Sequence, residues 1–120
     1  MPVSKPFQPM YVPNSGNAAG TLTSSLTISA LSTGAVSGAL PGNAGLNELN
    51  QIQISNTVAV WAYVNFGRNT TEIPAATVAA SYPVPPSTVI VVTVTSEVAA
   101  VSVILASSTG SVIFTRGTGV

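Results

Sequence analysis

The chain has 120 residues, a formal net charge of zero and 5% charged side chains, against about 25% in an ordinary soluble domain. It contains no Asp, His or Cys, which excludes a disulfide framework, a thiolate metal site, a cysteine nucleophile and a Ser-His-Asp triad. Its three basic residues are too few to neutralise a run of phosphates, so nucleic-acid binding is not expected.

Residues 1–20 are predicted to form an extended arm. Four prolines among the first thirteen residues fix the backbone and remove amide donors. They also interrupt the apolar run that a signal peptide requires, so none is expected. The arm carries three large apolar side chains, Phe7, Met10 and Tyr11. We expect residues 1–17 to contact a neighbouring molecule; the alternative is an edge strand folded back onto the chain's own sheet.

The first predicted strand of the domain covers residues 21–31. Its alternation places Ser and Thr on a solvated face and apolar residues on the opposite face, the latter being Leu22, Leu26, Ile28 and Ala30. The connection 32–47 is rich in Gly, Ala and Ser and long for a loop. A short strand around residues 35–40 is expected inside it.

Two further strands flank a break at Asn56-Thr57. The first covers residues 48–55. The second covers residues 58–66, and its period of two places Trp61 and Tyr63 on one face. This pair is interpreted either as a packing surface or as a sugar-binding platform, and we favour packing. A turn at residues 67–69 follows.

The last part of the chain alternates turns with β-branched runs, which are typical of strands. The expected elements are a short strand near 76–80, a stiff proline link at 82–86, strands over 88–95 and 99–106, a hairpin turn at 107–110 and a final strand over 111–115. About eight strands without helical periodicity predict an all-β fold. Residues 21–120 are therefore expected to form one two-sheet sandwich, most simply a jelly roll.

The few charged residues indicate no catalytic or metal site. Glu48, Glu72 and Glu97 are far apart in the sequence, so no catalytic carboxylate pair, metal or cofactor is predicted, and we do not expect an enzyme. Glu97 also interrupts the apolar stretch 89–105, where a charge would cost about 2.5–3.5 kcal/mol in a membrane, so this stretch is not expected to span one and no membrane partner is predicted. Asn69-Thr70-Thr71 matches the N-glycosylation pattern. Arg68 and Arg116 are interpreted either as anchors to a partner or as edge-strand charges that discourage aggregation.

A neutral surface of this kind suits association, because net charge is what keeps soluble proteins apart. We therefore expect a homodimer or homotrimer. The candidate interface residues are Phe7, Met10, Tyr11, Trp61, Tyr63, Arg68 and Arg116.

The segment Gln53–Gly67 contains a strand ending in an Asn-Thr turn, followed by a strand ending in Phe-Gly. This pattern resembles a segment of small virion proteins of tailed phages. The next pieces also match in order: a proline link, two Val-rich strands and a small-residue hairpin, at Tyr82–Pro86, Val89–Thr95, Val98–Ala106 and Ser107–Arg116. Over about residues 50–120 the chain resembles the jelly-roll cement, or decoration, proteins on the capsids of short-tailed bacteriophages.

This resemblance implies a structural virion protein without catalytic residues or cofactors. Such a protein is made in the host cytoplasm, binds the outside of the capsid lattice and stabilises it, with the major capsid protein and its own copies as partners. The arm would then contact the capsid or a neighbouring subunit. Two alternatives remain: a head- or tail-fibre subunit, and a carbohydrate- or surface-binding sandwich that uses Trp61 and Tyr63.

Overall fold

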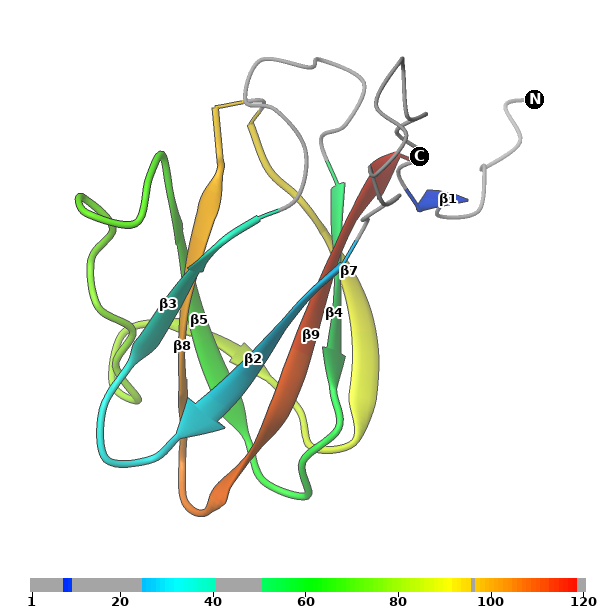
Figure 1. Cartoon of the computed structure of the whole chain (residues 1–120). Helices are drawn as coiled ribbons and strands as arrows, with labels where there is room; N and C mark the ends of the chain where they lie inside the picture. Colours follow the sequence, from blue (N-terminus) through cyan, green and yellow to red (C-terminus); the bar gives the residue numbers. More distant parts are fainter. Residues whose placement is uncertain (1–7, 10–24, 41–50, 96, 119–120) are drawn as a thin grey trace, which may run out of the picture.

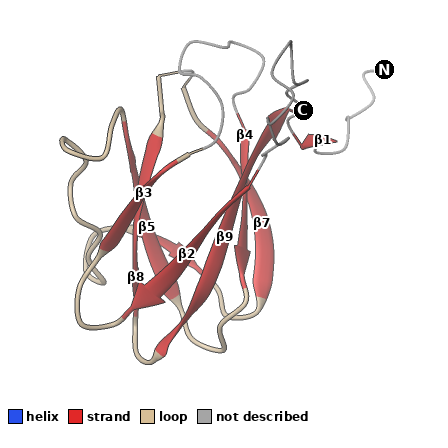
Figure 2. Cartoon of the chain, in the orientation of Figure 1, coloured by secondary structure: helices blue, strands red, loops and turns tan. Residues whose placement is uncertain are grey.

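The computed structural model describes residues 8–9, 25–40, 51–95 and 97–118. These residues form nine strands and no helix (Figure 2). The strands make two antiparallel sheets that pack against each other (Figure 1). The prediction of an all-β, two-sheet sandwich is therefore confirmed.

In sheet A, β1 and β2 both pair with the same side of β9, and β4 and β7 follow on the other side of β9 in that order. Its strands are β1 (Gln8–Pro9), β2 (Ser25–Leu31), β9 (Thr109–Thr118), β4 (Gln51–Asn56) and β7 (Thr88–Thr93). Sheet B has the order β3-β8-β5-β6. Its strands are β3 (Val36–Ala39), β8 (Ala100–Leu105), β5 (Ala62–Gly67) and β6 (Tyr82–Val84).

The core lies between the sheets because apolar side chains occupy every second position of most strands. On β4, Ile52 and Ile54 are fully buried, whereas Gln51, Gln53 and Ser55 between them are half-buried. The core cluster consists of Ile28, Ala30, Leu40, Ile52, Ile54, Ala62, Val64, Val84, Val101, Val103, Leu105, Val112 and Phe114. The alternation predicted for residues 21–31 is confirmed over the described part, Ser25–Leu31, where Ile28 and Ala30 are buried.

Most connections carry the chain from one sheet to the other. Residues 32–35 link β2 to β3, 57–61 link β4 to β5, 85–87 link β6 to β7, 94–99 link β7 to β8 and 106–108 link β8 to β9. The hairpin expected at 107–110 is therefore wrong, because β8 belongs to sheet B and β9 to sheet A. The inward apolar side chains of each sheet are covered by the opposite sheet.

The strand predicted at 76–80 does not form, because polar side chains there bond to nearby backbone and close a turn instead. The Thr77 amide donates to Ser81 Oγ over 2.8 Å, and the Ala80 amide donates to Thr77 Oγ1 over 3.2 Å. Only the first part of the proline link expected at 82–86 forms a strand: Tyr82–Val84 make up β6, an edge strand on which Pro83 is tolerated.

The strand expected over 58–66 begins only at Ala62 because Asn56 holds the preceding loop. The Asn56 side chain is 2% exposed. Its Oδ1 accepts the Val58 amide over 3.0 Å, and its Nδ2 donates to the carbonyls of Val60 and Pro85, each over 3.0 Å. One buried amide thus joins the loop after β4 to the loop after β6.

Two residues of the N-terminal arm are described, and they pair with the chain's own sheet. Gln8 lies opposite Thr118, and Pro9 lies opposite Gly117. At these two positions the arm is a strand of the chain's own sheet, which was the alternative prediction. Phe7, Met10 and Tyr11 lie outside the described residues, so contact between the arm and a neighbouring molecule stays a prediction.

Candidate functional site

The outer face of sheet A is a broad surface without formal charge among its described positions. The register aligns the outward residues of β2, β9, β4 and β7 in rows, such as Thr27, Ile113, Ser55 and Val89. The outward set is Ser25, Thr27, Ser29, Leu31, Thr109, Ser111, Ile113, Thr115, Gln51, Gln53, Ser55, Val89, Val91 and Thr93. It contains hydroxyl, amide and aliphatic groups only.

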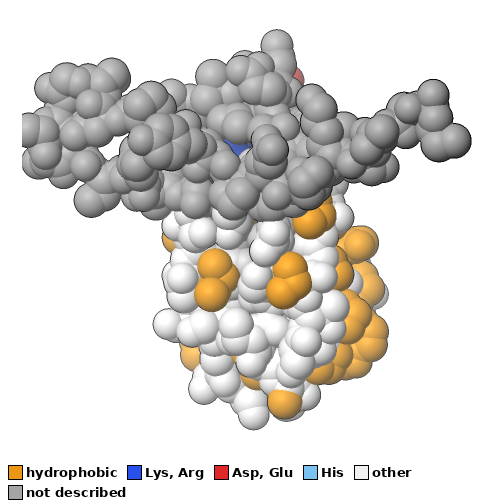
Figure 3. Space-filling view, turned by 90° about the vertical axis from the view of Figure 1, so that its right-hand side faces the viewer, with side chains coloured by type: hydrophobic (Ala, Val, Ile, Leu, Met, Phe, Trp, Pro, Cys, Tyr) orange, Lys and Arg blue, Asp and Glu red, His pale blue; other side chains and the backbone are white. Residues whose placement is uncertain are grey.

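Figure 3 looks at the side on which Figure 1 places β9, β4 and β7. Most of the described surface is white, and orange side chains gather along one border. Some hydroxyl and amide groups of this face already bond to each other. Ser25 Oγ and Thr115 Oγ1 are 2.8 Å apart, and Gln51 Nε2 donates to Thr93 Oγ1 over 3.4 Å. A partner can cover such a face without desolvating a charge.

The outer face of sheet B is partly covered by the connection between β5 and β6. Asn65 Nδ2 donates to the carbonyls of Pro74 and Ala75 over 3.2 and 3.3 Å. The Ala76 amide donates to Ser102 Oγ over 3.0 Å, and both of these residues are buried. Two polar side chains of the sheet therefore hold residues 74–76 against it, a role that the sequence analysis did not assign to them.

Replacing Ser102 by alanine should loosen this connection. The Ala76 amide would stay buried without its acceptor, which costs about 1–3 kcal/mol of the free energy of unfolding. Residues 68–81 should then be cleaved faster by protease in the native state. Thr95→Ala is a suitable control because Thr95 is exposed. Equal cleavage of both variants and the wild type would show that Ser102 does not hold the connection.

Beyond this connection, sheet B presents an apolar patch that includes the predicted aromatic pair. Tyr63 on β5 lies directly opposite Ile104 on β8 and Pro83 on β6. Trp61 precedes β5, and its carbonyl accepts the Ala106 amide over 2.9 Å, which extends the β5–β8 pairing by one residue. The period of two then places Trp61 beside Tyr63. Trp61 is 44% exposed, whereas Tyr63 is half-buried. We call Trp61, Tyr63, Pro83 and Ile104 the aromatic patch.

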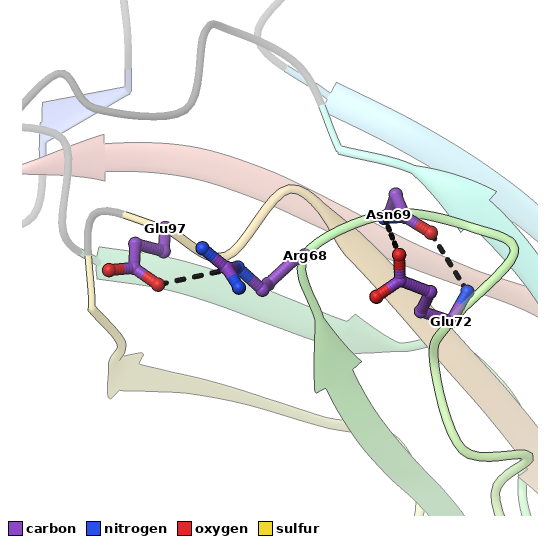
Figure 4. Close-up of polar contacts among 4 residues, drawn as sticks. All are labelled: Arg68, Asn69, Glu72 and Glu97. Atoms are coloured by element: carbon purple, nitrogen blue, oxygen red, sulfur yellow. Dashed lines mark hydrogen bonds and ion pairs between the residues drawn. The ribbon is translucent and has the colours of Figure 1, made fainter.

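The described acidic residues have separate partners, as Figure 4 shows. Glu97 Oε1 lies 3.4 Å from Arg68 Nε, and both side chains are mostly exposed. Glu72 Oε1 accepts Asn69 Nδ2 over 3.2 Å. The Arg68–Glu97 pair is exposed to solvent and adds little stability. Glu48 lies outside the described residues.

Asn69, the acceptor of the glycosylation pattern, organises its own turn. Its Oδ1 accepts the amides of Thr71 and Glu72 over 2.9 and 2.8 Å. Asn69 is exposed, but its Nδ2 is engaged by Glu72. The presence of Asn69 in the sequence Asn69-Thr70-Thr71 is therefore explained by its role in the turn.

Arg116 is inside the domain, not on its surface. It is 1% exposed, and its Nη2 donates to the Val98 carbonyl. Burial lowers the pKa of Arg116 from its ordinary value, but arginine stays protonated in proteins. Both sequence interpretations placed Arg116 at the surface, and both are wrong. Arg116 shares the inward period of Val112 and Phe114 on β9, a pattern that could have revealed its burial.

The described part of the chain holds no cluster of three or more His, Cys, Asp or Glu side chains suited to a metal ion. Within the same residues, no helix is long and apolar enough to cross a membrane. No protein-family model, curated protein or solved structure matches the chain.

Proposed function

We propose that the protein is a structural subunit of a virion, a decoration protein that binds the outside of a phage capsid. The observation that carries the proposal is the charge-free outer face of sheet A. Depletion of charge is characteristic of the central part of protein interfaces, and a specific interface needs about 800 Å² from each partner. A sheet face of hydroxyl, amide and aliphatic groups suits this use.

The strand order supports a jelly roll within this proposal. Counted from β2 as the first strand, sheet A carries the first, eighth, third and sixth strands, and sheet B the second, seventh, fourth and fifth. This is the order that results when a long hairpin of four strand pairs is wrapped into two facing sheets, as in jelly rolls of capsid proteins. It agrees with the fold implied by the resemblance of residues 50–120.

The test is the composition of purified particles of the phage that encodes the chain. The protein should be present in many copies, and antibodies against it should label the outside of intact heads. Label confined to the tail or to fibres would favour the fibre alternative. Absence of the protein from intact particles would contradict a virion role altogether.

A second candidate function is carbohydrate binding through the aromatic patch. The exposure of Trp61 beside Tyr63 is the observation that favours it, because sugars stack on accessible aromatic faces. A glycan array of the wild type and of Trp61→Ala separates the two functions. Binding that is lost in Trp61→Ala supports carbohydrate binding. No binding by the wild type leaves the aromatic patch as a protein-contact surface.

A further inference from the structure

Strand β7 forms an edge of sheet A that is open to pairing. Among the described residues it pairs with β4 alone. Its sequence, Thr-Val-Ile-Val-Val-Thr, contains neither charge nor proline. An exposed edge strand presents unpaired amide and carbonyl groups, and proteins usually guard such edges with charges, prolines, bulges or short length.

The side chains of β7 are also incompletely covered. Val89 and Val91 on the outer face are 58% and 44% exposed. Ile90 and Val92 point toward the core and are still only half-buried. On the adjacent strand β4, Ile52 and Ile54 are 0% exposed. Apolar burial is therefore incomplete on both sides of β7, as expected for a strand that lacks a neighbour.

The other edges are protected or polar. In sheet B, β6 contains Pro83, and β3 has only four residues. The outward positions of β2 are Ser25, Thr27, Ser29 and Leu31. Among the described edge strands, β7 alone exposes two large aliphatic side chains on its outward face, Val89 and Val91, whereas β2 exposes one, Leu31.

We propose that β7 pairs with β7 of a second copy of this chain. The two strands run antiparallel across a two-fold axis, and the two A sheets join into one continuous sheet. This inference goes beyond the capsid role, since it concerns what the chain does on its own.

A second copy fits this edge because the contact is self-complementary. A two-fold axis presents the same edge from both subunits, so each open edge closes the other and the assembly stops at two. The chain has no net charge and β7 has no charged residue, so identical strands meet without repulsion. When the two-fold axis passes at Ile90 or at Val91, that residue lies opposite its own copy, and the outward residues of the two strands lie on the same face of the joined sheet. They form a continuous aliphatic stripe of Val89 and Val91 from each subunit.

The test compares sedimentation of the purified full chain with that of charge variants at residue 91. The wild type should be a dimer at tens of micromolar. Val91→Lys and Val91→Glu, at a position already 44% exposed, should each raise the dissociation constant about tenfold or more, because like charges then face each other. Mixing the two variants should restore the dimer. The control is Thr27→Lys, an outward position on β2 at the other side of sheet A, which should leave the dimer unchanged.

A monomeric wild type overturns the proposal, as does dimerisation that survives Val91→Lys or that Thr27→Lys weakens equally. If the residue-91 variants fail to fold, hydrogen exchange of the wild type decides. Protection of the β7 amides that increases with protein concentration supports the pairing, and protection independent of concentration overturns it. None of these results depends on particle composition, so failure of the dimer and failure of the capsid role are distinguishable.

Discussion

Replacing Asn56 by alanine should lower the free energy of unfolding by about 3–5 kcal/mol, because several buried or partly buried backbone groups lose their partner together. The Val58 amide would lose its acceptor, and the carbonyls of Val60 and Pro85 would lose their donor. A third carbonyl, that of Val84, accepts the same Nδ2 at 3.4 Å. Chemical denaturation followed by tryptophan fluorescence measures the change.

The matched control is Asn69→Ala. Asn69 also accepts two backbone amides in a turn, but it is exposed, so water replaces the lost bonds. Its substitution should cost about 1 kcal/mol or less. Comparable losses for the two variants would mean that the junction of the loops after β4 and β6 does not depend on the buried amide.

Replacing Phe114 by alanine should destabilise the domain by about 3–5 kcal/mol, the range for large-to-small changes in a packed core. Phe114 is 0% exposed on β9, and the register places it between Leu26 of β2 and Ile54 of β4. Its removal leaves a cavity at the centre of sheet A. Urea denaturation midpoints and slopes report the loss.

The control for this substitution is the neighbouring residue on the same strand. Ile113 points outward and is half-buried, so Ile113→Ala should cost clearly less than Phe114→Ala, about 1 kcal/mol. A larger loss for Ile113→Ala would mean that the outer face of sheet A is covered by something that contributes to folding.

The strands themselves were largely predictable, because alternation is a local property of the sequence. The pattern of β2 identified both the strand and its buried face, and β4 was predicted as a strand over residues 48–55. The short strand β3 was also anticipated inside a Gly-rich connection. The period of two was sufficient there, since one face of each strand had to meet the opposite sheet.

The features that depend on long-range contacts were not predictable. Asn56 looks like an ordinary turn residue until Pro85, 29 positions later, is placed beside it. The hydroxyl of Ser102 likewise finds its partner across 26 positions. The β-branched run of β7 is typical of a buried central strand, yet the sheet order makes it an edge. Local patterns carry no information on sheet order, which decides which surface stays open.

The capsid role is tested most directly by reconstitution on particles that lack the protein. Purified protein should bind in a saturable, fixed ratio to the major capsid protein and raise the temperature at which the particles release their genome. A charge placed on the outer face of sheet A, as in Gln53→Lys, should weaken binding about tenfold, while the free energy of unfolding of the free protein stays unchanged. Failure of the wild type to bind, or binding that leaves the release temperature unchanged, would contradict a role in stabilising the capsid.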